Sequence, residues 1–253
     1  LLEHYQNGRY EDAEKLALIL TDKFRTHPFG WKVLGAVLNQ TGRISEGLIA
    51  CQKSVALAPE NAEAHFNLGN TLRKLGRLEE AEVSCRKAIA LKADYAEAHY
   101  NLGNTLKEID RLEEAEESYR QVITLKPDFA EAHNNLGNTL KELGRLEEAE
   151  ESYRQVIALK PDFAKAHNNL GITLKELGRL EEAEESYRQA IALKPDFAEA
   201  LLNRGQLSFD KGEFEIALRY FDLCNTKRSR ARALSSLYAL GRIEDIYKRI
   251  ETQ

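Results

Sequence analysis

Apolar and polar residues alternate along the segment 130–163 with the period of an α-helix. The first half carries leucines three or four residues apart, which places them on one helical face: Leu136, Leu140 and Leu143. The second half carries a further apolar stripe: Leu146, Ala149, Tyr153, Val156 and Ile157. Gly144 lies between the stripes, where a helix commonly ends, and Pro161 follows the second stripe. The segment is therefore predicted to form two antiparallel helices.

The same pattern recurs along the chain with a period of 34 residues. One series of glycines falls within the first helix: Gly35, Gly69, Gly103, Gly137, Gly171 and Gly205. A second series, with an aspartate in one slot, marks the turn between the helices: Gly8, Gly42, Gly76, Asp110, Gly144, Gly178 and Gly212. Because one helix pair cannot bury its apolar faces alone, the repetition predicts an all-α solenoid in which each pair packs on its neighbours.

Small and acidic residues indicate how these helices approach and begin. Gly137 and Ala149 are expected to let the two helices of a pair pack closely. Two Asp–Glu pairs have the spacing of a capping box at the start of a first helix: Asp128 with Glu131, and Asp196 with Glu199. The later repeats depart from the pattern, since Arg204 and Ser208 stand where the other repeats have leucines.

These positions resemble the tetratricopeptide repeat (TPR). The resemblance rests on the following residues: Trp31, Leu34, Gly35, Pro59, Leu136, Gly137, Leu140, Ala149, Tyr153 and Pro161. It implies a right-handed superhelical solenoid whose first helices line a concave face. It also implies a partial repeat at 1–27, followed by six repeats: 28–61, 62–95, 96–129, 130–163, 164–197 and 198–231. Residues 232–253 are expected to form a degenerate cap or a junction, because Gly241 is out of phase with the glycine series.

Composition excludes several classes of protein. The 253 residues carry a net charge of -5, and no apolar run approaches the length of a membrane helix. The acidic balance argues against a nucleic-acid partner. Three cysteines favour a reducing compartment over a disulfide framework, so a cytoplasmic protein without a secretory leader is expected. Because the chain opens at Leu1 and lacks methionine, we expect it to be a segment of a longer protein.

Amide and amino side chains recur on the first helices, along the stripe expected to line the concave face. One asparagine lies two positions before the glycine in five successive repeats: Asn67, Asn101, Asn135, Asn169 and Asn203. A second series lies three positions later: Asn70, Asn104 and Asn138. Lysines extend the stripe: Lys107, Lys141 and Lys175. We expect these residues to bind a protein or peptide partner.

A carboxamide donates and accepts hydrogen bonds, so a row spaced by one repeat can hold the backbone of an extended peptide. The row is similar to that in the TPR superhelix of O-linked N-acetylglucosamine transferase, although the chain lacks that enzyme's catalytic domain. This resemblance implies recognition of a polypeptide backbone. The alternative is that recent duplication copied neutral asparagines, which then serve only solubility or internal hydrogen bonds.

Histidines and cysteines do not point to a metal or catalytic site. The histidines of four repeats lie one repeat apart, too far to converge on one ion: His65, His99, His133 and His167. They are expected to be packed and hydrogen-bonded. Cys51 and Cys85 share the slot of Tyr119 and are expected to be buried fillers. The sequence offers no phosphate-binding loop and no nucleophile with a base, so neither cofactor nor enzymatic activity is predicted.

The predicted function is therefore a protein-interaction scaffold that binds an extended peptide in a concave groove. Two alternatives stay open. The chain is the substrate-recruiting arm of a larger enzyme, glycosyltransferase-like or other, whose catalytic domain lies outside it. Otherwise it is a structural solenoid that stacks end to end with further copies. No nucleic-acid or membrane partner is expected.

Overall fold

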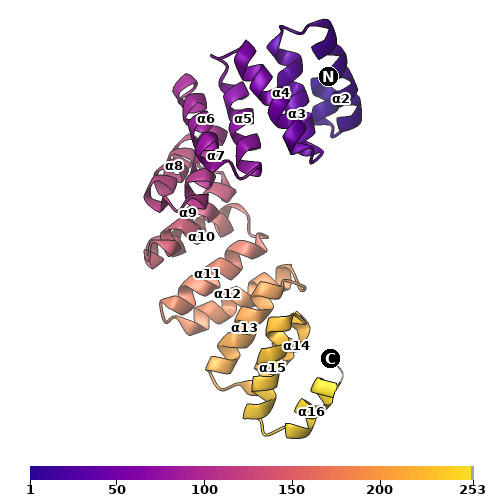
Figure 1. The fold of residues 1–253 in the computed structure, drawn as a ribbon. Helices are drawn as coiled ribbons and strands as arrows, with labels where there is room; N and C mark the ends of the chain where they lie inside the picture. Colours follow the sequence, from indigo (N-terminus) through magenta and orange to yellow (C-terminus); the bar gives the residue numbers. More distant parts are fainter. Residues whose placement is uncertain (252–253) are drawn as a thin grey trace. The chain divides into compact units, whose positions relative to one another are not determined.

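The computed structural model of the chain describes residues 1–251, in which helices are joined by short turns and no strand occurs (Figure 1). The helices are α1 (Leu2–Gln6), α2 (Tyr10–Lys23), α3 (Pro28–Gln40), α4 (Ile44–Leu57), α5 (Ala62–Lys74), α6 (Leu78–Leu91), α7 (Ala96–Glu108), α8 (Leu112–Leu125), α9 (Ala130–Glu142), α10 (Leu146–Leu159), α11 (Ala164–Glu176), α12 (Leu180–Leu193), α13 (Ala198–Asp210), α14 (Phe214–Cys224), α15 (Lys227–Ala239) and α16 (Ile243–Glu251). The predicted all-α solenoid of antiparallel helix pairs is confirmed.

Each repeat pairs a first helix with a second helix, as α7 packs on α8 and α11 on α12. The first helix of the next repeat packs on that second helix, as α7 does on α6 and α11 on α10. First helices of neighbouring repeats also contact each other directly, as α5 and α7 do. The chain divides into two compact units, residues 1–132 and the part that starts at His133, and this packing holds within each of them.

Two kinds of glycine act at different places in the repeat. Gly144 in the turn has a φ of +76°, a left-handed conformation that other residues rarely adopt. Gly137 instead lies inside α9, where a Cβ atom would come within 2.7 Å of the ring of Tyr153. The close approach predicted for Gly137 is therefore made to the tyrosine ring, which is fully buried on α10.

The predicted capping boxes are wrong. The N-cap residue of α13 is Phe197, one residue after Asp196, and no side chain caps that helix. The start of α9 follows the same arrangement, because the N–H of Ala132 donates to the carbonyl of Phe129 rather than to Asp128. The ring of Phe129 packs 5.0 Å from that of Tyr100. Both helices thus begin after the aromatic residue that follows the aspartate, which leaves the aspartate outside the cap.

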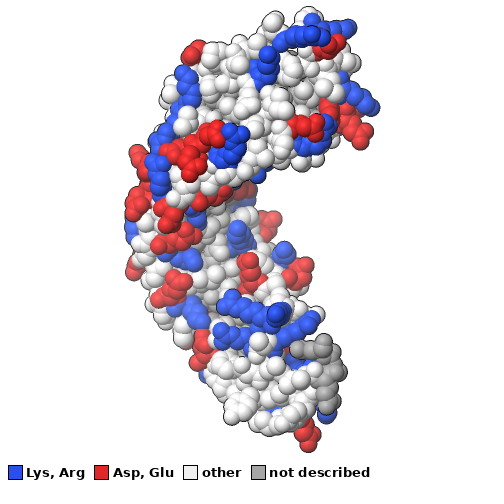
Figure 2. All heavy atoms as spheres, viewed as in Figure 1, with Lys and Arg blue, Asp and Glu red and all other residues white. Residues whose placement is uncertain are grey.

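Arginine side chains link the second helix of one repeat to that of the repeat before it. In the first unit, Arg111 Nη1 donates to Glu82 Oε1 at 2.7 Å, while its Nη2 donates to Glu114 at 2.6 Å. In the second unit, Arg179 makes the equivalent bonds at 2.6 Å, to Glu150 and Glu182. Acidic and basic side chains accordingly lie interspersed on the visible face (Figure 2).

A buried cation replaces leucine in the repeat of α13 and α14. Arg204 is only 6% exposed, and its Nη2 donates to Glu184 Oε1 at 2.6 Å. Its Nη1 donates to Ser208 Oγ at 2.7 Å, and the guanidinium lies 5.2 Å from the centre of the Tyr220 ring. The two departures from leucine are therefore linked, since the serine hydroxyl serves the arginine.

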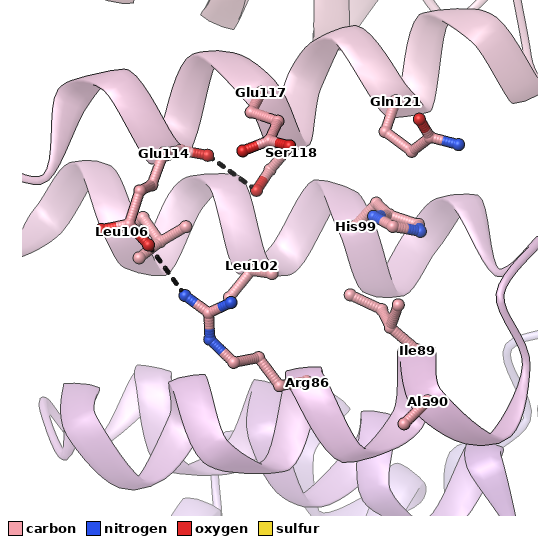
Figure 3. A pocket seen from close by; sticks show the side chains of 10 residues that line it. All are labelled: Arg86, Ile89, Ala90, His99, Leu102, Leu106, Glu114, Glu117, Ser118 and Gln121. Atoms are coloured by element: carbon pink, nitrogen blue, oxygen red, sulfur yellow. Dashed lines mark hydrogen bonds and ion pairs between the residues drawn. The ribbon is translucent and has the colours of Figure 1, made fainter.

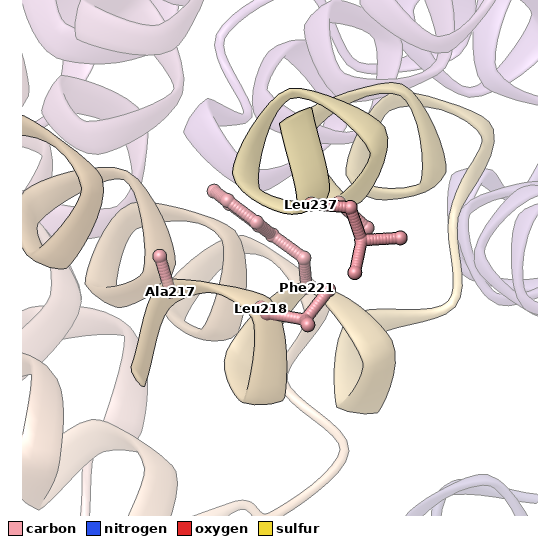
Figure 4. Packing of buried hydrophobic residues seen from close by; sticks show 5 residues of the cluster. Ala217, Leu218, Phe221 and Leu237 are labelled. Atoms are coloured by element: carbon pink, nitrogen blue, oxygen red, sulfur yellow. The ribbon is translucent and has the colours of Figure 1, made fainter. Parts of the chain in front are cut away.

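The C-terminal helices are out of phase because α14 is shorter than the other second helices. It has 11 residues where α12 has 14, and Asn225 ends it with a φ of +44°. Thr226 then caps α15, so the repeat boundary expected after residue 231 lies inside that helix. Figure 4 shows Phe221 of α14 and Leu237 of α15, which share one buried cluster.

Among the helices of the described residues, none is both long and apolar enough to cross a bilayer.

Candidate functional site

The first helices present two different faces, and α7 illustrates them. At 3.6 residues per turn, Asn101 and Asn104 lie nearly opposite to Leu102 and Leu106. The leucines are buried against the second helices, on the side where α6 and α8 pack. The asparagines therefore point to a different side of α7 from these leucines.

The asparagines of the first unit differ in how they are held. Asn67 and Asn70 are half-buried, and their side chains make no hydrogen bond to any described residue. Asn101 is only 8% exposed. The carboxamide oxygen of Asn104 accepts a hydrogen bond of 2.8 Å from the hydroxyl of Tyr119.

In the second unit the asparagines form a network that joins neighbouring repeats. Asn169 Nδ2 donates to Asn138 Oδ1 at 3.0 Å and to Asn134 Oδ1 at 3.3 Å. Asn134 Nδ2 donates in turn to Asn135 Oδ1 at 3.3 Å. A second hydrogen bond also runs from the later repeat to the earlier one, since Asn203 Nδ2 donates to Asn168 Oδ1 at 3.0 Å.

Tyrosines of the second helices complete this arrangement. The hydroxyl of Tyr153 donates to Asn138 Oδ1 at 2.8 Å, as the hydroxyl of Tyr119 does to Asn104. Tyr153 is buried, and this desolvation raises the pKa of its hydroxyl. It therefore stays protonated and remains a donor at neutral pH.

Tyr187 occupies the same slot one repeat later but lacks an asparagine partner, because Ile172 stands where Asn138 does. Burial raises the pKa of its hydroxyl as well.

The sequence pattern overlooked the tyrosine hydroxyls, because it assigned the tyrosines to the apolar stripe. It also overlooked Asn134 and Asn168, which are 4% and 1% exposed. A signal was present, since Tyr119 and Tyr153 each follow an asparagine of the second series by 15 residues.

The predicted lysines are in different electrostatic states. Lys175 Nζ lies 2.6 Å from Asp210 Oδ2, which holds it in an ion pair along the first helices. Arg73 makes the equivalent pair with Glu108 at 2.7 Å. Lys141 is half-buried and makes no hydrogen bond or ion pair within the described residues. Lys107 is half-buried. A guest at Lys175 therefore meets a neutralised pair rather than an isolated cation.

A pocket that the sequence did not predict lies on the other face of α7. It has a volume of about 390 Å³ and opens between α6 and α8, above Leu102 and Leu106. Figure 3 shows Arg86 reaching across it to Glu114, at a distance of 3.0 Å. An equivalent pocket lies between α2 and α4, next to Trp31. Such gaps depend on side-chain volumes between second helices, which helical periodicity does not report.

The histidines have the packing role that was predicted for them. The Nε2 atoms of three of them lie 2.8 to 3.0 Å from the carbonyl oxygen six residues earlier: His65, His99 and His167. Trp31 Nε1 donates to the equivalent carbonyl, that of Arg25, at 3.0 Å. No cluster of three or more metal-ligating side chains occurs in the described part of the chain.

The cysteines are held as thiols. Cys51 and Cys85 are buried, and burial raises the pKa of the Cys85 thiol to about 12. A thiol in this state is a poor nucleophile at neutral pH.

Models of the tetratricopeptide repeat match consecutive stretches of the chain: 2–62, 50–83, 69–110, 103–144, 137–178 and 164–197. Together they run from residue 2 to residue 197. The chain belongs to the tetratricopeptide repeat family. TPR chains are protein-interaction repeat proteins, and they bind protein or peptide partners. A comparison with curated protein sequences finds no match.

Solved structures share the TPR fold. YrrB, described as a TPR protein with an unusual peptide-binding site, is 23% identical, with a TM-score of 0.64 over 75% of this chain and 97% of YrrB. MamA is 27% identical, with a TM-score of 0.61 over 66% of this chain and 97% of MamA. A chain of the APC/C hetero-tetramer Cut9-Hcn1 is 16% identical, with a TM-score of 0.72 over 92% of this chain and 47% of its own. The resemblance to O-linked N-acetylglucosamine transferase stays a prediction.

Proposed function

We propose that this TPR chain is a non-catalytic scaffold that binds an extended polypeptide along the asparagine face of its first helices. The observation that carries the proposal is the state of Asn138 and Asn169 in neighbouring repeats. Asn138 keeps both N–H groups of its carboxamide, because among the described residues only its oxygen is bonded. Asn169 keeps its carboxamide oxygen, because its bonds to Asn138 and Asn134 use the nitrogen.

This pair offers a donor and an acceptor to a guest, which are the two groups that complement a peptide unit. The internal bonds therefore use only part of the hydrogen-bonding capacity of the asparagines. They also hold the side chains in place, which lowers the entropy lost when a guest binds. A backbone-directed contact of this kind suits a site that repeats along the chain.

The test uses a 12-residue peptide selected from a random displayed library against the intact chain. Asn138→Ala combined with Asn169→Ala removes both groups, and the affinity for the peptide is expected to fall at least tenfold. The matched control is Glu117→Ala combined with Gln121→Ala. It changes the pocket between α6 and α8, called the outer pocket below, and is expected to leave the affinity unchanged. An unaltered affinity in the asparagine variant, with helicity retained, contradicts the proposal.

The cysteines support placing the chain in a reducing compartment. Cys51, Cys85 and Cys224 are all free, and the first two are buried. We therefore propose that the scaffold acts in the cytoplasm, where thiols stay reduced.

A further inference from the structure

We propose that Tyr153 is a positioning residue that holds Asn138 as a hydrogen-bond donor, so that this repeat selects a backbone carbonyl of the guest. The inference rests on the proposed function and assigns a direction to one of its hydrogen bonds. It follows from three contacts within the second unit, those of Tyr153, Asn138 and Asn169.

The tyrosine hydroxyl reaches Asn138 because the ring lies flat against the neighbouring helix. Gly137 makes this possible, since a Cβ atom there would lie 2.7 to 3.0 Å from three atoms of the ring. The ring of Tyr153 is fully buried, and its hydroxyl meets Asn138 Oδ1 at 2.8 Å. The packing of α9 on α10 thus fixes the position of the donor.

Two donors converge on the same carboxamide oxygen. Asn169 Nδ2 lies 3.0 Å from Asn138 Oδ1, in addition to the Tyr153 hydroxyl at 2.8 Å. An amide oxygen has two lone pairs, so both are used. A rotation of the carboxamide by half a turn would place the NH2 group of Asn138 against the NH2 group of Asn169. That arrangement loses the bond from Asn169 and turns the Tyr153 hydroxyl from a donor into an acceptor, so the orientation that keeps both bonds to the oxygen is favoured.

The orientation decides what Asn138 can bind. Its oxygen is saturated, and its NH2 group donates to no other described residue. A guest must therefore supply an acceptor at this point, and the carbonyl of an extended backbone is the acceptor that every residue carries. At Asn169 the requirement is reversed, because the free group there is the oxygen. A guest N–H satisfies it.

The chain itself contains a matched control. Tyr187 occupies the slot of Tyr153 and is equally buried, at 1% exposure against 0%. It meets no asparagine, because Ile172 replaces the residue equivalent to Asn138. Removing either hydroxyl therefore changes the core in the same way, whereas only Tyr153→Phe releases a carboxamide.

The experiment compares Tyr153→Phe with Tyr187→Phe in the intact chain, using the same selected 12-residue peptide. Tyr153→Phe is expected to weaken binding about fivefold, the size of one net hydrogen bond, and Tyr187→Phe to leave it unchanged. Without peptide, the side-chain NH2 signals of Asn138 in a nitrogen–proton correlation spectrum are expected to shift only in Tyr153→Phe. Replacing the guest amide that faces Asn138 by an ester, a weaker acceptor, is expected to lower the affinity for the wild-type chain.

A variant that is expected to gain affinity tests the same arrangement. Ile172→Asn places an asparagine beside Tyr187, as Asn138 stands beside Tyr153, and it is expected to tighten binding about fivefold. The gain should disappear when Tyr187→Phe is added. If Tyr153→Phe binds as the wild type does while Asn138→Ala does not, the positioning role is wrong and the proposed function stands. If neither variant loses affinity, both are wrong.

Discussion

At the scale of single residues, Arg204 shows how the array tolerates a charge in its core. Leucines at this slot in other repeats, such as Leu136 and Leu170, are buried apolar side chains, whereas the buried Arg204 bonds to Glu184 and Ser208. A buried ion pair recovers little more than the cost of removing its charges from water. Arg204 is therefore a feature that the fold accommodates rather than one that stabilises it.

Restoring the leucines of the repeat should stabilise the second unit. Arg204→Leu combined with Ser208→Leu replaces a buried polar pair by the side chains found in the preceding repeats, and a gain of about 1 to 3 kcal/mol in unfolding free energy is expected. Urea titration followed by circular dichroism measures it. A loss of stability would mean that the local backbone no longer accepts the leucines.

The partner of Arg204 gives a pH dependence. Hydrogen bonding from Lys211, together with the charge of Arg204, lowers the pKa of Glu184. Its contribution to stability is thus present above the usual glutamate pKa and is lost as the pH falls through the lowered value. Between about pH 5 and pH 3, Glu184→Gln should lose less stability than the wild type does. Thermal unfolding at the two pH values measures this, and equal losses would contradict it.

At the scale of helices, the contact of Gly137 with Tyr153 sets the distance between α9 and α10. A Cβ atom would meet the ring at 2.7 Å, and the buried ring cannot move aside without displacing its hydroxyl from Asn138. The glycine thus serves both the packing of the pair and the orientation of the asparagine.

Gly137→Ala should therefore destabilise the chain by about 1 to 3 kcal/mol, the usual cost of overpacking. Gly144→Asn is the matched control, because asparagine tolerates the left-handed conformation and open space surrounds that turn. It should cost less than about 1 kcal/mol. Chemical denaturation compares the two variants. Equal losses of unfolding free energy would show that the contact between residue 137 and the tyrosine ring does not determine the cost of the substitution.

At the scale of the whole molecule, arginine links join repeat to repeat. Hydrogen bonds from Arg111 and Arg179 lower the pKa values of Glu114 and Glu182. These exposed carboxylates therefore add to stability at neutral pH, and that contribution is lost as the pH falls below their usual pKa. Among the described residues, Arg77 bonds only to Glu80 of its own helix, because Leu48 stands at the position of the partner in the preceding repeat.

The comparison of Arg111→Gln with Arg77→Gln isolates the link between repeats. Both variants lose a bond to a glutamate on their own helix, but only Arg111→Gln also loses Glu82 on α6. Its thermal midpoint should fall further below the wild type, and the difference should shrink in 1 M salt because screening weakens exposed pairs. Equal midpoints would show that the links between repeats contribute nothing measurable.

The sequence was sufficient for the fold because its signals are local and repeated. The glycine of the turn needs a left-handed backbone, and the leucine spacing defines one buried face, so both can be predicted without coordinates. The capping boxes failed because each helix begins after the aromatic residue that follows the aspartate, and at Phe129 that ring packs on Tyr100 of another helix. Asn138 was identified as a candidate, but its partner Tyr153 was assigned to the apolar core.

The orientation of the asparagines could not be predicted from spacing alone. It depends on whether a tyrosine hydroxyl and a neighbouring asparagine reach the same oxygen, which is a matter of tenths of an ångström. The outer pocket beside Arg86 and Glu114 was missed for the same reason, because it depends on how long side chains lie between two second helices.

The most direct measurement is a titration of the intact chain with the selected peptide, followed by nitrogen–proton spectra of its side-chain amides. Asn138 lies on α9, whereas Gln121 of α8 lines the pocket between α6 and α8, and both carry an NH2 group. The signals of Asn138 are expected to shift with the peptide concentration while those of Gln121 stay in place. Shifts confined to Gln121, beside the outer pocket, would contradict it.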